Sequence, residues 1–392
     1  MNGKTEETQR EGKKSIVVFS LASFLNDFGS DIIYPVWPIF VTSLTGVNMA
    51  ILGLIDGLGE AIVSISQAGS GYLSDRLRKR KIFIWTGYLF GCVSRVGYAF
   101  SKVWQYLIPF KVLDRAGKMR GAPRDAMVAD LSTDANRGRN FGLLRTMDNL
   151  GAVCGILTSI LLFGYLGWSY TNLFLLASLP SLVSVLLILL FIRDRKTRKI
   201  YKGLSLKDLT FNYKLFLLLS AVFALSAFSY SFLLIYAKKV GFAESSVPVL
   251  YLIFTAMASL TALFFGRLAD RLGRKLVLTL AYLLWGIMCV GFIYTSEYLG
   301  IILLFVLYGL HRGAIEPVQR TFVSELSPIE HRASLLGAFQ MTVGLCALPA
   351  SLVAGLLWDT FGKQAPFHFS LGLTSLTLIL MLFLKEKRNR RL

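Results

Sequence analysis

The sequence predicts an all-α membrane protein of twelve transmembrane helices, arranged as two pseudo-symmetric six-helix bundles. Three observations predict this class: the composition, the long uncharged runs and a repeat between the two halves. Of the 392 residues, 54% are hydrophobic and 17% are charged, whereas a soluble domain carries roughly 25% charged residues. Uncharged runs such as Leu173–Ile192 and Leu276–Tyr294 are close to the ~20 residues that cross a bilayer.

Twelve apolar spans can be drawn, and one charged segment divides them into two groups of six. They are residues 16–43, 49–74, 82–101, 105–129, 140–163, 168–192, 215–237, 247–266, 276–294, 299–324, 333–357 and 366–384. Residues 193–214 hold eight Lys and Arg and are predicted to be a cytoplasmic linker. The predicted domains are therefore an N-terminal bundle at residues 1–192, this linker, and a C-terminal bundle at residues 215–392.

The net charge of +19 is distributed unevenly along the chain. With these spans, 29 of the 42 Lys and Arg lie in the two tails and one set of loops, and only 4 lie in the opposite loops. Cytoplasmic loops of membrane proteins carry such an excess. We therefore expect a multi-pass protein of the cell membrane (the inner or plasma membrane) with both termini in the cytoplasm, and we expect no nucleic-acid partner.

The two halves share a sequence repeat at a constant offset of 195 residues. The matched landmarks are Gly71–Leu77 with Gly266–Leu272, Asp130 with Glu325, Arg137 with Arg332, and Gly142 with Gly337. A constant offset close to half the chain length indicates a duplication of six-helix units, related by an axis along the membrane normal.

In this repeat the chain resembles the major facilitator superfamily, whose signature after spans two and eight is G-x-L-a-D-R-x-G-R-K/R. The second copy, Gly266–Lys275, fits throughout, and the first copy has Arg78 where the pattern has Gly. The resemblance covers the whole chain in length, span count, topology and repeat. It implies the major facilitator fold and transport of a small molecule by alternating access.

Two further segments resemble the drug-exporter-like permeases of bacteria and archaea within that superfamily. Residues 26–35 bring acidic residues and a proline into the first span, and residues 114–125 bring a basic run into span four. The span-four arginine of the superfamily maps onto Arg115. The antiporter motif of span five, G-x-x-x-G-P-x-x-G-G, keeps only Gly151 and Gly155, which leaves antiport open.

Charged residues inside the spans are concentrated in the first half, which has 14 of them against 3 in the second. An ionised group within the membrane is costly and marks a pathway, a relay or a structural pair. We therefore predict that coupling chemistry resides mainly in the first half. The candidates for proton or substrate coupling are Asp27, Asp31, Glu60, Arg115, Arg145, Asp148, Arg312 and Glu316.

Two pairs of acids recur at four-residue spacing and so share a helix face. Asp27 and Asp31 lie on span one, where Asp27 is either a proton carrier or the fixed partner of a neighbouring arginine. Asp56 and Glu60 lie on span two and could bind a proton or a cation, although Asp56 could equally be solvated near the outer surface.

Opposite charges at helical spacing predict pairs on spans five and ten. Arg145 and Asp148 are three residues apart, and Arg312 and Glu316 are four apart. His311 could sense protons, but packing is the favoured interpretation.

Consecutive residues of span four point about 100° apart. Arg115 is therefore expected to face the cavity while Asp114 pairs with another helix. In span seven an aromatic stripe, Phe223–Tyr236, favours packing over a ligand cage. No residues suggest a metal site or a cofactor.

The repeated loops predict a cytoplasmic gate. Its members are Asp75, Arg76, Asp130, Asp270, Arg271 and Glu325. The two aspartates could cap a helix of the opposite half, and the two arginines could bond the acids at residues 130 and 325. The resemblance implies that these contacts hold the outward-open state and break as the halves rock.

Two functions remain open from the sequence. The first is a proton-coupled secondary transporter that exports a small amphipathic solute. The alternative is an organic-anion carrier for uptake or exchange that uses the cavity arginines. No Walker A loop, zinc pattern or nucleophile elbow is present, so an enzyme is not expected. The expected partners are the solute, protons and the lipid bilayer, with the protein acting as a monomer.

Overall fold

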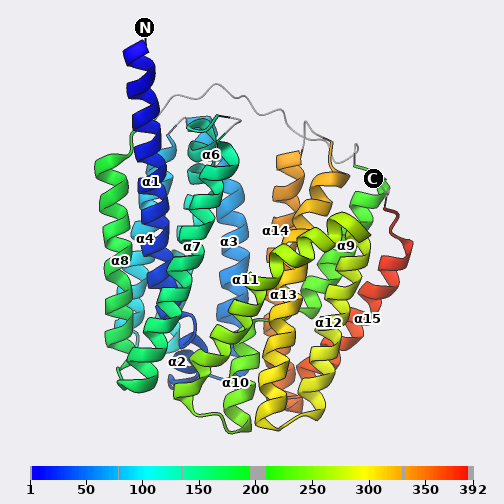
Figure 1. Ribbon diagram of the computed structural model, residues 1–392. Coiled ribbons are helices and arrows are strands. Elements are labelled where there is room, and N and C mark those ends of the chain that lie inside the picture. The colour runs from blue at the N-terminus through cyan, green and yellow to red at the C-terminus, as the bar shows by residue number, and fades with distance from the viewer. Residues whose placement is uncertain (1, 78, 134–135, 195–208, 329–331, 387–392) are drawn as a thin grey trace. The chain divides into compact units, whose positions relative to one another are not determined.

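A computed structural model describes residues 2–77, 79–133, 136–194, 209–328 and 332–386 of the chain, which form helices joined by short connections (Figure 1). The first-half helices are α1 (Asn2–Ile33), α2 (Trp37–Ser43), α3 (Met49–Leu77), α4 (Arg80–Phe100), α5 (Trp104–Ala116), η1 (Gly117–Arg120), α6 (Gly121–Asp130), α7 (Arg137–Ser159), η2 (Ile160–Tyr165) and α8 (Tyr170–Phe191). The second-half helices are α9 (Phe211–Ser226), α10 (Tyr230–Val240), η4 (Glu244–Ser246), α11 (Val247–Leu272), α12 (Arg274–Tyr294), α13 (Tyr298–Leu326), α14 (Arg332–Phe361) and α15 (Ala365–Phe383).

Each predicted span coincides with one helix or with a helix that is locally interrupted. Among the described residues, ten helical segments are long and apolar enough to cross a membrane. The two other predicted spans are α4, which includes the buried Arg95, and the segment α5–η1–α6, whose α-helical parts have only 13 and 10 residues. The predicted all-α, multi-pass architecture is confirmed.

Three spans are interrupted at places where the sequence does not favour a continuous helix. α1 ends before Pro35, which lacks a backbone N–H and disfavours a helical conformation at Tyr34. α9 and α10 are separated at residues 227–229, and the hydroxyl of Ser229 caps α10 by accepting from the N–H of Ser231. The short 3-10 helix η1 separates α5 from α6. All three interruptions lie next to polar residues of the candidate site.

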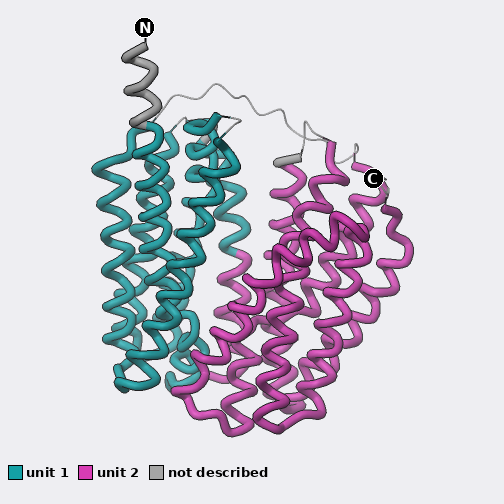
Figure 2. Tube along the Cα trace, viewed as in Figure 1, with its two compact units in different colours: residues 1–46, 62–200 teal, residues 47–61, 201–392 magenta. Residues whose placement is uncertain are grey.

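Contacts group the chain into two compact units (Figure 2). Unit 1 comprises residues 1–46 and 62–200, and unit 2 comprises residues 47–61 and 201–392. The beginning of α3 therefore packs with helices of the second half. The division into bundles at residues 1–192 and 215–392 stays a prediction.

In unit 1, α1 packs against α7 and α8, and α4 packs against α8 and α5 (Figure 1). Gly151 and Gly155 of α7 allow α1 to approach closely. A Cβ at Gly151 would lie 2.3 Å from the carbonyl oxygen of Phe24, and one at Gly155 would lie 2.4 Å from that of Phe28. The two glycines that remain of the span-five motif therefore have a packing role in this chain.

In unit 2, α13 packs against α11 and α12, and α15 packs against α9 and α12. Aromatic rings fill the interior between these helices. They include Phe223, Phe228, Phe232, Tyr236, Trp285, Phe292 and Phe367. Four of these rings come from predicted span seven, so the packing interpretation of its aromatic stripe is confirmed.

Candidate functional site

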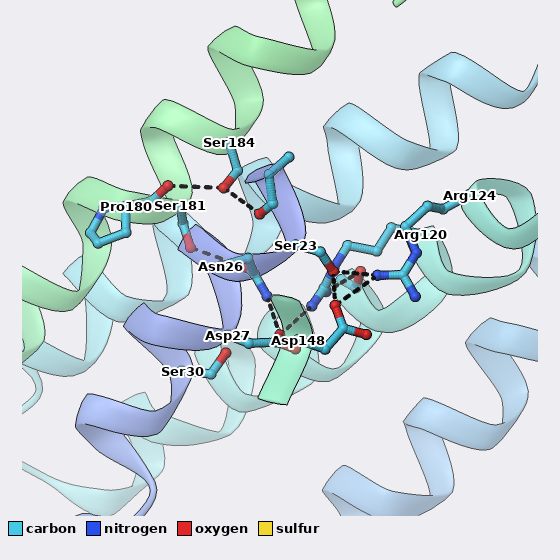
Figure 3. Close-up of polar contacts among 12 residues, drawn as sticks. Ser23, Asn26, Asp27, Ser30, Arg120, Arg124, Asp148, Pro180, Ser181 and Ser184 are labelled. Atoms are coloured by element: carbon cyan, nitrogen blue, oxygen red, sulfur yellow. Dashed lines mark hydrogen bonds and ion pairs between the residues drawn. The ribbon is translucent and has the colours of Figure 1, made fainter. Parts of the chain in front are cut away.

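A group of buried charges in unit 1 joins α1, α6 and α7 (Figure 3). The guanidinium of Arg124 donates to the hydroxyl of Ser23 at 2.5 Å and lies 3.6 Å from Oδ1 of Asp148. Ser23 in turn donates to the same oxygen of Asp148. Because Arg124 and Asp148 are both buried, removing either one would take away an opposite charge that faces the other in a poorly solvated environment.

Both members of this ion pair have a second partner. Nη2 of Arg124 lies 3.0 Å from Oδ1 of Asp125, and Arg145 lies 3.3 Å from Oδ2 of Asp148 and 3.6 Å from Oδ2 of Asp125. The predicted Arg145–Asp148 pair is thus one edge of a ring of four charges. The side chain of Arg145 is 58% exposed, which makes it the most exposed of the four.

Asp27 lies on α1 one turn beyond Ser23 (Figure 3). Its Oδ1 accepts from the side-chain amide of Asn26 at 3.1 Å and lies 3.8 Å from Nη2 of Arg120. Arg120 also donates to the carbonyl oxygen of Gly117 in η1 at 2.9 Å. The Asp27 side chain is 25% exposed. It therefore combines a long ion pair with access to water.

Asp31 lies one turn further along α1, in different surroundings. It is buried, and a Cβ at Gly155 of α7 would lie 3.0 Å from the Cβ of Asp31. The two acids thus share the continuous helix that their spacing predicts, but Asp31 lies against α7 whereas Asp27 pairs with Arg120 of η1.

Arg95 of α4 is a buried charge that sequence reasoning did not select as a site residue. Its guanidinium donates to the carbonyl oxygens of Asn26 at 3.1 Å and Ala177 at 2.8 Å. It also donates to the hydroxyls of Ser30, at 2.7 Å, and Ser181. Arg95 thus ties α1 to α8. The signal that could have identified it was an arginine in the middle of an apolar span.

Arg115 and Asp114 lie near the end of α5 and contact each other. Nε of Arg115 lies 3.6 Å from Oδ2 of Asp114, and Nη1 donates to the hydroxyl of Tyr34 at 3.4 Å. The expectation that Arg115 faces the cavity while Asp114 pairs with another helix stays a prediction, and the two neighbours also lie within ion-pair distance of each other. One turn earlier, the ammonium of Lys111 lies 3.8 Å from the centre of the Trp37 ring.

In unit 2, the predicted pair of Arg312 and Glu316 is present on α13. Their side chains are 45% and 54% exposed. His311 is buried instead, with Nδ1 2.8 Å from the carbonyl oxygen of Ala281 and its ring 5.2 Å from that of Trp285. These contacts support the packing interpretation of His311.

The two acids of α3 differ in burial despite their helical spacing. Asp56 is buried and accepts from the hydroxyl of Ser229 at 2.8 Å and from that of Ser231 at 2.5 Å. It anchors α3 to the start of α10, so the expectation of a solvated Asp56 is wrong. Glu60 is exposed and stays a candidate for binding a proton or a cation.

Where α4 begins, three residues form what we call the unit 1 staple: Arg80, Asp130 and Asp194. Nη1 of Arg80 lies 2.5 Å from Oδ2 of Asp130 at the end of α6. Asp194, three residues after α8, accepts from the N–H groups of Arg80 at 3.0 Å and Lys81 at 2.9 Å. The carboxylate thus satisfies backbone donors that the start of a helix leaves unpaired.

The unit 2 staple (Arg274, Glu325 and Glu386) has the same arrangement where α12 begins. Nη2 of Arg274 lies 3.1 Å from Oε1 of Glu325 near the end of α13 and 2.5 Å from Oδ1 of Asp270. Glu386, three residues after α15, accepts from the N–H groups of Arg274 at 2.6 Å and Lys275 at 3.2 Å. The duplication therefore extends to contacts beyond the repeated sequence motif.

The staples correct one expectation about the gate. Arg76 and Arg271 were expected to bond the acids at residues 130 and 325, but the structure pairs those acids with Arg80 and Arg274. The reason is the position of each arginine. Arg80 begins α4 beside the end of α6, and Arg274 begins α12 beside the end of α13. Arg76 and Arg271 are instead exposed at the ends of α3 and α11.

The expected contacts of Asp75 and Asp270 with the opposite half stay predictions. The side chain of Asp75 lies outside the described residues. Asp270 bonds within its own unit, to Arg274.

Within the described part of the chain, no group of three or more His, Cys, Asp and Glu side chains could hold a metal ion. The candidate site therefore consists of ion pairs, hydroxyls and aromatic rings.

Comparison with known proteins adds a family and several relatives. The family description "Major Facilitator Superfamily" matches residues 19–237 and 215–392. An uncharacterised MFS-type transporter of Methanocaldococcus jannaschii is 36% identical over 391 residues, covering 97% of both chains. The quinolone resistance protein NorA of Staphylococcus aureus is 23% identical over 395 residues, covering 96% of this chain and 98% of its own.

A solved structure also has the same fold. The crystal structure of a point mutant of the nucleoside transporter NupG matches with a TM-score of 0.79 and 14% sequence identity. The match covers 95% of this chain and all of the other. At this identity the likeness establishes the fold alone.

Proposed function

This chain belongs to the Major Facilitator Superfamily of membrane transporters, and from that premise we propose that it is a proton-coupled exporter of small amphipathic solutes. It is a transporter and not an enzyme. We place it as a monomer in the cell membrane with both termini in the cytoplasm, because the excess of Lys and Arg in its tails and one set of loops favours that orientation.

The proposal that transport is coupled to protons rests on the surroundings of Asp27. Its carboxylate lies 3.8 Å from Arg120, compared with 3.0 Å between Arg124 and Asp125. A carboxylate within a span, with a distant cation and a quarter of its side chain exposed, has the geometry that a proton carrier needs, since an ionised group within the membrane marks a pathway, a relay or a structural pair. Protonation would release Arg120, which keeps its bond to the backbone of η1.

Arg312 and Glu316 support the choice of an amphipathic solute. Both are about half exposed, and Tyr308 lies one turn before Arg312 on α13. The Tyr308 ring packs against Phe254 at 4.9 Å between centroids. These two rings are themselves buried, so the charges of both signs at the pair carry this point: they suit a solute that has a polar or charged group. The S. aureus relative is named for resistance to quinolones, which are solutes of this kind.

Alternating access gives the two staples a mechanical role in this proposal. Each joins the ends of three spans within its own unit through Arg80 or Arg274, so each half can move as a body. The proposed gate lies in the repeated loops, with Asp270 and Arg271 in the second copy and residues 75 and 76 in the first. Its contacts would break as the halves rock.

The test of proton coupling uses the Asp27→Asn variant in proteoliposomes with a fluorescent quinolone as the solute. We expect the variant to lose transport driven by a pH gradient, because the amide cannot carry the proton. It should keep the exchange of internal for external quinolone in the absence of a gradient, which needs only solute binding and alternation. Unchanged gradient-driven transport would remove Asp27 from the mechanism.

The matched control for this test is Glu244→Gln. Glu244 pairs with Lys238 in an exposed connection, so its loss removes a carboxylate without touching the candidate site. We expect both kinds of transport to remain in this variant. Loss of both in Asp27→Asn would indicate a folding defect, and we would then turn to Asp27→Glu.

An organic-anion carrier, in uptake or exchange, is the second candidate function. The exposed guanidinium of Arg145, which holds two carboxylates at 3.3 and 3.6 Å, favours it because an anionic solute could displace those acids. Arg115 and Arg312 would assist. In this case Arg115→Gln should lose binding of an anionic solute outright, whereas under the first proposal a neutral or cationic drug should still bind.

A further inference from the structure

An open groove runs along the surface of unit 1 where α4 packs against α5. Its volume is about 400 Å³, which lies within the roughly 300–1,000 Å³ of sites that hold a small organic ligand. Its walls include Cys92, Val93, Val96 and Phe100 of α4, and Tyr106 and Phe110 of α5. Phe100 and Tyr106 are exposed, so the groove opens onto the surface of the protein.

The walls of this groove present mainly apolar groups. The hydroxyl of Ser101, which also lines the groove, donates to the carbonyl oxygen of Gly97 at 2.8 Å. Gly97 itself meets the Phe110 ring directly, because a Cβ there would lie 2.2 Å from the ring. The two helices thus touch through a ring and a backbone at this level. An occupant of the groove would therefore be held along its length by apolar contacts.

The groove has the length of one leaflet of a bilayer. It follows α4 from Cys92 to Phe100, which is about 12 Å of helix at the usual rise per residue. One leaflet contributes about half of a hydrocarbon core that is roughly 30 Å thick. The groove occupies the end of α4 that is remote from Arg80 and the unit 1 staple. An apolar chain of the leaflet opposite the staples therefore matches it in length.

Lys102 provides a positive charge at the Phe100 end of the groove. It directly follows the lining residue Ser101, and its side chain is exposed. With the predicted spans it is one of only four Lys and Arg on this side of the membrane. Two of the others have partners of their own, since Lys238 forms an ion pair and Lys363 contacts an aromatic ring. An exposed ammonium beside an aromatic residue at the end of a span suits the phosphate of a lipid headgroup.

We propose that this groove retains one phosphate-bearing membrane lipid of the leaflet opposite the staples. A hydrocarbon chain of the lipid lies between α4 and α5, and its phosphate pairs with Lys102. The apolar walls call for the chain, and the ammonium at one end calls for the phosphate. The lining does not include Asp27 or Arg312, so the site exists whatever the transported solute is.

Native mass spectrometry of the detergent-purified protein tests this site without any transport assay. The protein is stripped of lipid and then mixed with phosphatidylglycerol, or with diacylglycerol that carries the same chains. We expect one phosphatidylglycerol to remain bound at collision energies that remove all others. Diacylglycerol should bind at least about fivefold more weakly, because it lacks the phosphate that pairs with a lysine near the membrane surface. Equal retention of the two lipids would overturn the proposal.

Two variants with matched controls then locate the retained lipid. Lys102→Gln should weaken retention of phosphatidylglycerol to the level of diacylglycerol, whereas Lys239→Gln, at an exposed lysine of unit 2, should leave it unchanged. Val93→Trp fills the groove and should abolish retention of the lipid. Val290 of α12 has the same 43% exposure as Val93, so Val290→Trp is its control and should retain the lipid. Wild-type retention in Val93→Trp rules the site out.

The competing occupant of the groove is the transported solute. A fluorescent quinolone added in excess to the unaltered protein should leave the bound phosphatidylglycerol in place, because the solute and the lipid have separate sites. Displacement of the lipid by the quinolone would assign the groove to the solute and contradict the proposal.

Discussion

The two units bury different chemistry under the same architecture. The interior of unit 1 holds charged and hydroxyl side chains, with Arg95, Arg124 and Asp148 all at most 9% exposed. The interior of unit 2 is mainly an aromatic packing around Trp285, which also contains the buried His311. Yet both units carry the same staple where their third span begins. The duplication has therefore preserved what holds each half together, while the interiors have diverged.

This difference in the buried side chains suggests different roles for the two units. Buried ion pairs add little net stability, since desolvation offsets their attraction, but they can change partners when one member gains a proton. Aromatic packing has no such alternative state and provides rigidity. Under the proposed function, unit 1 is the part that would respond to protons, and unit 2 would act as its rigid counterpart.

The largest expected loss of stability comes from a substitution in the aromatic interior of unit 2. Trp285→Ala should destabilise the protein by about 3–5 kcal/mol, because it opens a large cavity and removes the 2.8 Å hydrogen bond from Nε1 to Ser370. Thermal or denaturant unfolding in detergent measures the change. Trp168, which is 37% exposed, provides the control, and Trp168→Ala should change stability by less than about 1 kcal/mol. Equal effects would mean that unit 2 does not depend on its aromatic core.

The next largest loss of stability is expected in the charged interior of unit 1. Asp148→Asn should cost about 2–3 kcal/mol, since it removes one of the two carboxylates that face the buried Arg124. The value stays below the about 3–5 kcal/mol of a fully broken buried pair because Asp125 remains 3.0 Å from Arg124. Unfolding in detergent again measures it. If Asp125→Asn, at the more exposed acid, cost more than Asp148→Asn, the assignment of Asp148 as the central acid would be wrong.

The contrast between the units was only partly predictable from the sequence. The lengths of the apolar runs predicted the spans, because a span depends on local composition. The repeat at an offset of 195 residues added the division into two related halves. Helical spacing likewise predicted the pairs Arg145–Asp148 and Arg312–Glu316, whose members lie on one helix. Such contacts follow from the 3.6-residue period alone.

Contacts between distant helices could not be predicted in this way. The bonds of Arg95 to α1 and α8, and of Asp56 to the start of α10, depend on which faces meet after packing. The partners of the acids at residues 130 and 325 depended on where the next helix begins, a boundary that the sequence leaves uncertain by a few residues.

A smaller effect tests how tightly unit 1 holds Arg95. Gly29→Ala would place a Cβ 2.3 Å from Nη1 of Arg95 and 2.4 Å from the carbonyl oxygen of Ala177, so we expect a loss of about 1–3 kcal/mol from overpacking. In unit 2, Gly286→Ala meets only ordinary contacts, at 3.8 Å or more, and should stabilise the helix by about 0.5–1 kcal/mol. Unfolding midpoints that shift in the same direction would contradict this account.

The smallest effects should be equal in the two units, because they concern the staples. Asp194→Ala and Glu386→Ala each remove the carboxylate that accepts two backbone N–H groups at the start of α4 or α12. Loss of such a cap costs about 0.5–2 kcal/mol, or about 2–4 °C in the unfolding midpoint per kcal/mol for units of this size. Because the two carboxylates belong to different units, the double variant should lose the sum of the two single losses. A measurable loss from one variant alone would mean that the staple has been conserved in form in both units but supports stability in only one of them.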